Sequence, residues 1–174
     1  MYRTVRTIAS GGMGRVDLVV RREGSFARAY ALKRLHSALA SNGAVRAMIL
    51  DEARIAGLVR HANVVSVLDV GQDPSGPFLL MELVEGISLA RLIAASVERS
   101  ELLPLQICME IARQTAEGLN AAHELHVPGA QKGGVVHSDV SPSNVLCGFD
   151  GGVRVTDFGI ARALDRTSSA SSAL

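Results

Sequence analysis

The chain has 174 residues, a net charge of +1 at neutral pH and a hydrophobic content of 48%. A chain of this length buries about 68–70% of its unfolded surface, so it can form one domain or a large and a small lobe, and this composition excludes intrinsic disorder. The balanced charge and an aromatic content of 3% give no reason to expect nucleic acid or an anionic membrane as a partner. Because neither a signal region nor a run of the ~20 apolar residues that span a membrane is present, we expect a cytoplasmic protein.

Short runs of apolar and β-branched residues, bounded by turn residues, predict strands in the first half of the chain. They fall within 2–35, at 64–70 and at 78–83, and the last two are joined by a turn-forming stretch at 71–77. Between them, helical spacing of apolar residues predicts a helix over 44–60.

The second half of the chain is predicted to be mainly helical. Ser88 is a suitable N-cap for a helix over 89–96, and Pro104 can begin a long helix that continues to Leu125. The long helix carries apolar residues on one side, namely Ile107, Ile111, Leu119 and Ala122. Short strands are predicted after a loop at 127–134, at 135–136, 145–147 and 153–155. The change of character near Gly86 indicates an α+β fold in two lobes.

The two cysteines, Cys108 and Cys147, have apolar neighbours and no CxxC or zinc-binding spacing. We therefore expect buried, reduced thiols.

A glycine cluster lies between the first two predicted strands. Gly11, Gly12 and Gly14 would let main-chain N–H groups approach phosphate oxygens, and Val16 follows them. A dinucleotide-binding loop would need a helix next, and a Walker A loop would need lysine where Arg15 stands, so a strand–turn–strand form is favoured. The alternative is an ordinary flexible hairpin.

Lysine is rare in this chain, which contains only Lys33 and Lys132. Lys33 lies inside an apolar predicted strand, where an ammonium group needs a partner. It suits the phosphates of ATP, and Glu52 on the next predicted helix is the candidate carboxylate to fix it. The alternative for Glu52 is a solvated helix charge.

Asp139 and Asn144 are five residues apart, and Asp157 follows thirteen residues later. Asp139 can accept the proton of a substrate hydroxyl, and the oxygens of Asn144 and Asp157 suit Mg²⁺. Each residue alone could equally be a turn former. Their order, together with the glycine cluster and Lys33, favours a phosphoryl-transfer site that uses ATP and Mg²⁺.

With these motifs, the chain resembles the eukaryotic-type protein kinase family over residues 2 to about 163, and Gly11-Gly12-Met13-Gly14 is most similar to its bacterial Ser/Thr members. The resemblance implies a two-lobe kinase fold with a complete N-lobe sheet and its helix, followed by an incomplete helical C-lobe. The implied divisions are an N-lobe at 1–84, a partial C-lobe at 85–163 and a Ser/Ala-rich start of an activation segment at 164–174.

The resemblance also implies roles for individual residues. Asp139 would be the catalytic aspartate, Lys33 and Glu52 an ion pair, and Asn144 and Asp157 the Mg²⁺ ligands. Met81 would be the gatekeeper, Glu82-Leu83-Val84 the hinge, and His137 would pack on Phe158. The residues implied to contact ATP are Ile8, Gly11, Gly12, Gly14, Val16, Ala31, Lys33, Met81, Glu82 and Leu83.

Three positions depart from the family pattern: Ala9 replaces a loop glycine, Ser138 an arginine and Ser141 a lysine. The arginine would pair with a phosphorylated activation loop and the lysine would steady the transferred phosphoryl group, so regulation and rate are both affected. None of the three changes removes a nucleotide or metal ligand.

The chain ends seventeen residues after Asp157, without the remaining C-lobe helices of the family. We therefore expect a fragment of a protein kinase that phosphorylates protein hydroxyls. Exposed apolar faces on the 104–125 helix and the catalytic loop would favour a covering protein partner. The alternatives are an ATP-binding pseudokinase or regulatory fragment without transfer activity, and a remnant that does not fold alone.

Overall fold

The computed structural model describes residues 2–11, 14–35, 56–126 and 134–158, together with positions 43, 47, 50, 53 and 54. These residues form two compact units. The first contains the described residues up to Gly57 and the segment Ser66–Leu83. The second contains Leu58–Val65 and the described residues from Val84 onward.

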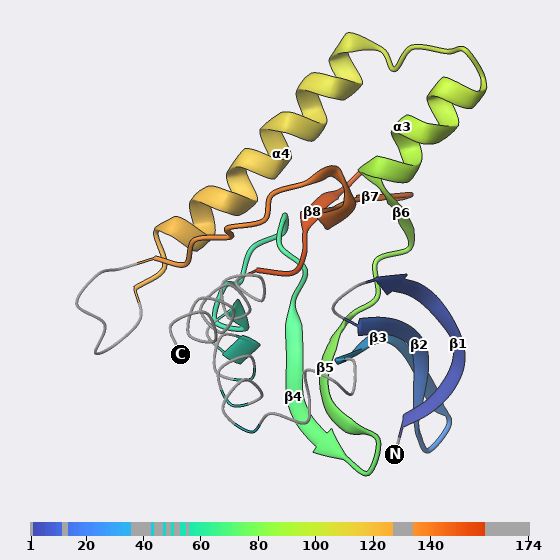
Figure 1. Cartoon of the computed structure of the whole chain (residues 1–174), viewed down its shortest axis with the longest axis vertical. Helices are drawn as coiled ribbons and strands as arrows, with labels where there is room; N and C mark the ends of the chain where they lie inside the picture. The colour runs from blue at the N-terminus through green and yellow to red at the C-terminus, as the bar shows by residue number, and fades with distance from the viewer. Residues whose placement is uncertain are drawn as a thin grey trace, which may run out of the picture. The chain divides into compact units, whose positions relative to one another are not determined.

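The first unit is built on a five-stranded antiparallel sheet in the order β1-β2-β3-β5-β4 (Figure 1). Its strands are β1 Tyr2–Gly11, β2 Gly14–Glu23, β3 Phe26–Leu35, β4 Val67–Asp73 and β5 Gly76–Glu82. β2 and β3 are joined by the turn at Gly24 and Ser25, and β4 and β5 by the turn at Pro74 and Ser75, so each of these pairs is adjacent in sequence and in space.

Alternation of side chains gives this sheet two different faces. One face carries a buried apolar cluster of Val19, Leu32 and Leu80, covered by Tyr2, Tyr30 and Phe78. The opposite face carries Ala31 and Lys33, because each is offset by one residue from Leu32 on the same strand.

The prediction of strands within 2–35 is confirmed, while the boundaries of the later pair were wrong. β4 begins at Val67 instead of 64, and only Pro74 and Ser75 remain as a turn in the predicted stretch 71–77. Residues 71–73 are polar or turn-forming, but their weak local preference for a turn is outweighed by pairing with β5. All described positions between 43 and 56 are helical, which agrees with the predicted helix over 44–60. Gly57 begins a turn, so the helix ends before the predicted residue 60.

The second unit combines two helices with a three-stranded sheet in the order β6-β7-β8. Ser88 caps the first helix as predicted, since its hydroxyl accepts a hydrogen bond from Arg91 N. The elements are β6 Gly86–Ser88, α3 Leu89–Glu98, α4 Leu105–His123, the 3-10 turn η1 Pro142–Asn144, β7 Val145–Gly148 and β8 Val153–Val155. β6 was not predicted, and 135–136 is not a strand, so that prediction was wrong.

Helix α4 packs on β8, beside which it lies in Figure 1. Ile111 joins Val145 and Val153 in a buried cluster, and Ala122 is fully buried. Ile107 and Met109 remain exposed, so the predicted apolar side of this helix is covered only in part by the described residues. Val136 and Val140 beside the catalytic loop are also exposed, as expected.

The prediction of reduced thiols agrees with the structure, but the prediction that both are buried was wrong. Both thiols are free, but Cys108 is exposed on α4 because it lies off the row of residues that faces β8. Cys147 on β7 is half-buried, and this burial raises the pKa of its thiol. No helix among the described residues is long and apolar enough to cross a membrane.

Candidate active site

The predicted catalytic loop brings Asp139 and Asn144 into direct contact. Asn144 Nδ2 donates hydrogen bonds to the carbonyl oxygen of Asp139 at 2.9 Å and to its Oδ2 at 3.0 Å. The turn η1 makes this possible, because Pro142 begins it and Asn144 N bonds to Ser141 O at 3.0 Å. The segment from Asp139 to Asn144 therefore folds back on itself, so that the two side chains point at each other.

His137 links this loop to the end of β8. Its ring is almost fully buried, Nε2 lies 2.9 Å from Thr156 O, and Asp139 N donates to Nδ1 at 3.2 Å. Since Nδ1 accepts a hydrogen bond, the ring proton belongs on Nε2, which then donates to the carbonyl. The expected packing of His137 on Phe158 is confirmed, with ring centroids 4.5 Å apart.

Two residues of this region have left-handed backbones. Ser138 has φ 65° and Asp157 has φ 66°, a conformation that costs a non-glycine residue free energy unless its surroundings hold it. The bonds from His137 to Thr156 and from Asp139 to His137 lie directly beside these two residues and fix them. Such strain is typical of functional sites and places the two aspartates on defined, constrained backbones.

Asn144 and Asp157 are chemically suited to a divalent cation. Nδ2 of Asn144 is committed to Asp139, so its Oδ1 is the atom available as a ligand. Thr156 N donates to Asn144 O at 2.9 Å, which ties together the backbones of the two candidate ligands. Within the part of the chain that the structure describes, no three His, Cys, Asp or Glu side chains gather, so a cation here would complete its shell with phosphate and water, as Mg²⁺ prefers.

The first unit gathers four of the predicted ATP contacts on one sheet face. The strand register pairs Val16 with Lys33 and Ala31 with Met81, and directly paired residues of neighbouring strands share a face. Lys33 is only 5% exposed, so its side chain is buried on this face. Ala31 and Met81 are buried beside it.

The remaining predicted contacts lie at the ends of these strands. Gly11 pairs with Gly14 where β1 turns into β2, and Ile8 sits at a register shift of β1. At the other end, Glu82 N donates to Ser66 O at 3.0 Å, and Glu82 Oε1 accepts from Ser66 N at 2.8 Å. An adenine ring held by the predicted hinge would therefore bond to main-chain groups other than the N–H of Glu82, such as the main-chain groups of Leu83 and Val84.

Two predicted site residues, Gly12 and Glu52, lie outside the described residues. The predicted pair of Lys33 with Glu52 therefore stays a prediction.

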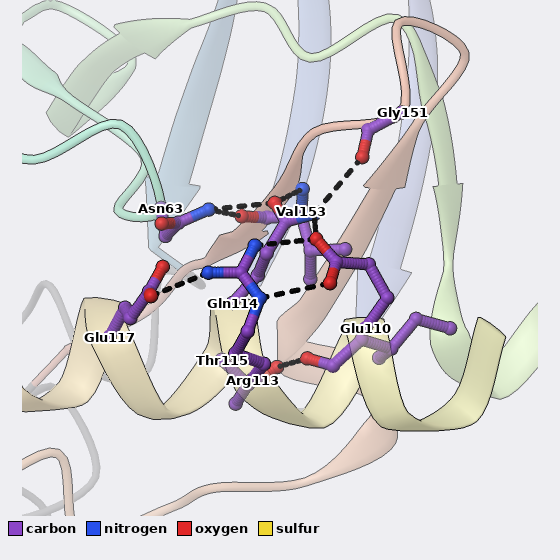
Figure 2. Close-up of polar contacts among 9 residues, drawn as sticks. Asn63, Glu110, Arg113, Gln114, Thr115, Glu117, Gly151 and Val153 are labelled. Carbon is purple, nitrogen blue, oxygen red and sulfur yellow. Dashed lines mark hydrogen bonds and ion pairs between the residues drawn. The ribbon is translucent and has the colours of Figure 1, made fainter. Parts of the chain in front are cut away.

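Sequence reasoning missed a buried amide network in the second unit, shown in Figure 2. Gln114 on α4 accepts from Asn63 Nδ2 at 2.8 Å and from Val153 N at 2.7 Å. The available signal was the polar Gln114 between Ile111 and Gly118 on the buried row of a helix.

A second missed feature lies next to Lys33. Arg34 donates two parallel hydrogen bonds to the carboxylate of Asp73, at 2.9 and 2.8 Å, and its guanidinium lies over the ring of Phe78. The bonds from Arg34 lower the pKa of Asp73. This bidentate pair connects β3 to the end of β4 through the face opposite Lys33.

A five-stranded sheet with a buried lysine, together with a helical unit that holds a His–Asp–Asn loop and a following Asp-Phe-Gly, defines a protein kinase domain. The protein kinase domain model matches residues 2–174, and the chain belongs to this family. Members of the family in general use ATP and Mg²⁺ and act on protein substrates.

Bacterial kinases are among the similar proteins. The chain is 32% identical over 166 residues to the tyrosine-protein kinase MasK of Myxococcus xanthus, covering 95% of this chain and 26% of that protein. It is 34% identical over 169 residues to the serine/threonine-protein kinase PknA of Mycobacterium tuberculosis, covering 94% of this chain and 36% of that protein. The chain thus spans about a quarter to a third of these relatives.

The fold is similar to solved kinase domains. The crystal structure of the M. tuberculosis PknI kinase domain matches with a TM-score of 0.73 and 28% sequence identity, covering 91% of this chain and 58% of that chain. The predicted α+β kinase fold, with its five-stranded sheet and incomplete helical part, is therefore confirmed.

Proposed function

We propose that this chain is the nucleotide-binding and catalytic-loop part of a serine/threonine protein kinase, which transfers the γ-phosphate of ATP to a protein hydroxyl. The observation that carries the proposal is the pairing of Asn144 with Asp139 in a loop joined through His137 and Thr156 to Asp157. This arrangement holds a proton acceptor and two oxygen ligands on one constrained segment.

Each residue has a defined task in this proposal. Asp139 orients the substrate hydroxyl and accepts its proton, while the hydrogen bonds from Asn144 fix the direction of its carboxylate. Lys33 binds phosphate oxygens of ATP, and the apolar face with Ala31 and Met81 contacts the base. Asn144 Oδ1 and Asp157 would hold Mg²⁺, which neutralises phosphate charge when bound.

Serine or threonine as the phosphate acceptor is supported by relatives such as PknA, whereas MasK is described as a tyrosine kinase. Phosphoamino-acid analysis of a protein substrate would distinguish the two. An ATP-binding pseudokinase is the second candidate, favoured by Ser138 and Ser141 at positions where the family pattern has arginine and lysine.

The proposal is tested first by thermal unfolding of the 174-residue chain with and without Mg·ATP. A ligand at about 100 times its Kd adds about 2.7 kcal/mol, which raises Tm by roughly 5–10 °C for a chain of this size. Lys33→Ala and Asp157→Ala should abolish the rise. Transfer of labelled phosphate that disappears in Asp139→Asn then separates the kinase from the pseudokinase. A cooperative wild-type transition that Mg·ATP does not shift would contradict both.

A further inference from the structure

Among the described residues, β7 is the only strand that pairs with β8, and the other edge of β8 carries an isolated parallel bridge between Val155 and Val64. The main-chain groups on that edge are bonded. Val153 N donates to Gln114 Oε1 at 2.7 Å, and Val153 O accepts from Asn63 Nδ2 at 2.8 Å. Val155 N donates to Asn63 O, and Val155 O accepts from Val65 N, both at 2.9 Å. Two side-chain amides and a short segment thus replace a neighbouring strand.

Gln114 uses its full hydrogen-bonding capacity in this position. Oε1 accepts from Asn63 and Val153, and Nε2 donates to Glu110 Oε1 at 2.9 Å and to Gly151 O at 3.2 Å (Figure 2). Gln114 is 9% exposed and Asn63 is 7% exposed. An apolar side chain of similar size would leave several buried groups unpaired, and water has little access to replace Gln114.

The close approach of Asn63 to helix α4 depends on Gly118, one turn after Gln114. A Cβ at this position would collide with the carbonyl oxygen of Asn63 and lie 3.1 Å from its carbonyl carbon. The helix, the amide side chains and the backbone of Asn63 therefore fit together in one arrangement.

The strand held in this way leads straight into the candidate active site. Thr156, directly after β8, bonds through its carbonyl to His137 and through its N–H to Asn144 O. Asp157 follows with its left-handed backbone. A shift of β8 along or away from α4 would move Thr156 and Asp157 relative to Asn144.

We propose that Gln114, together with Asn63, is a positioning residue for Asp157 and acts through β8. The inference rests on the proposed function, in which Asp157 and Asn144 bind Mg²⁺. Its consequence is specific: Gln114 determines how much Mg²⁺ adds to the affinity of the chain for ATP, and it has little effect on metal-free nucleotide binding.

The test compares Gln114→Met with Glu117→Gln in the 174-residue chain. Glu117 is one turn away on the same helix, is exposed and pairs with Arg113, which makes it a matched control. The affinity for ATP is measured with Mg²⁺ and with a chelator. Gln114→Met should reduce the Mg²⁺-dependent gain by about 10–100-fold, the usual effect of losing a residue that orients a metal ligand. Metal-free affinity should change by less than about twofold, and Glu117→Gln should match wild type in both.

A second readout uses no ligand. Amide hydrogen exchange at Val153 should become about 5–30-fold faster in Gln114→Met, corresponding to a loss of one or two kcal/mol of protection. If Gln114→Met does not fold, Gln114→Glu serves instead. It keeps an acceptor for Asn63 and Val153, but it replaces the donors to Glu110 and Gly151 with a carboxylate oxygen that repels the Glu110 carboxylate, so a loss in the same direction is expected.

The outcomes separate the inference from the proposed function. A wild-type gain from Mg²⁺ that persists unchanged in the Gln114 variants would overturn the positioning role and leave the kinase proposal standing. Unchanged exchange at Val153 would overturn it as well. A wild-type chain that gains nothing from Mg²⁺ would overturn the proposed function and the inference together.

Discussion

Asn144 Nδ2 bonds to both the main-chain carbonyl and the side-chain Oδ2 of Asp139, at 2.9 and 3.0 Å. One amide group therefore fixes the backbone and the carboxylate of the proposed proton acceptor at the same time. The same side chain has its Oδ1 left for a cation, so proton acceptance and metal binding depend on a single rotamer of Asn144.

Asn144→Ala should consequently weaken both stability and Mg²⁺-linked ATP binding. Loss of the two bonds to Asp139 is expected to lower the free energy of unfolding by about 1–2 kcal/mol, or Tm by roughly 2–8 °C. Thermal unfolding with and without Mg·ATP measures both effects. Ser143→Ala, an exposed neighbour in the same turn, should stay within about 0.5 kcal/mol of wild type. Equal effects of the two variants would refute the role of Asn144.

His137→Phe tests the connection between the loop and β8. The new ring can still pack on Phe158, but Thr156 O and Asp139 N lose their partner. We expect a loss of about 2 kcal/mol or more in unfolding free energy, since two partly buried groups are left unpaired. Denaturant unfolding provides the measurement, and His126→Phe on the surface is the control. A variant as stable as wild type would show that ring packing alone holds Phe158.

The pair Arg34–Asp73 predicts a pH dependence. Arg34 lowers the pKa of Asp73 below its ordinary 3.8, so the carboxylate favours the folded state. This stabilisation is fully present above the ordinary pKa and is lost as the pH falls through the lower, folded-state pKa. Asp73→Asn should therefore be less stable than wild type at neutral pH, and the difference should disappear at acidic pH below 3.8.

Unfolding of both proteins across pH 7 to about 2.5 checks this expectation. Asp69→Asn removes an exposed carboxylate that accepts a hydrogen bond from Val70 N, and it serves as the control. A gap between Asp73→Asn and wild type that stays constant down to the lowest pH would contradict the ion pair as the cause.

Gly118→Ala and Gly43→Ala should have opposite effects, although both replace helical glycines. Alanine is intrinsically better than glycine in a helix by about 1 kcal/mol. At Gly43, which is exposed and has no atom within 4 Å of a new Cβ, the change should be neutral or stabilising. At Gly118 the collision with Asn63 should outweigh the gain and destabilise the fold by about 2 kcal/mol. Thermal unfolding of both variants decides, and a stabilised Gly118→Ala would contradict the tight contact.

Much of the fold followed from local sequence patterns. The alternating strands within 2–35, the capping role of Ser88 and the helix from 105 to 123 all rest on neighbours a few residues apart, and each was predicted. Boundaries failed where pairing across strands decides them, as in β4, and where an element has only three residues, as in β6.

The spacing of Asp139 and Asn144 predicted that the two residues act together, and the structure places them in direct contact, while their catalytic and metal-binding roles stay predictions. The residues that support them were not predicted. Gln114 bonds to Asn63 and to Val153, which are 51 and 39 residues away, and Arg34 bonds to Asp73 at a separation of 39. A polar residue in an apolar row shows that a partner must exist, but only the folded chain identifies it.

The closed edge of β8 also bears on solubility. A strand with free main-chain donors and acceptors is a template on which another molecule can add a strand, the first step of edge-to-edge aggregation. At Val153 and Val155 those groups are already taken by Gln114, Asn63 and Val65. The contacts proposed to orient Asp157 therefore also prevent a strand of another molecule from pairing with this edge, directly beside the candidate active site.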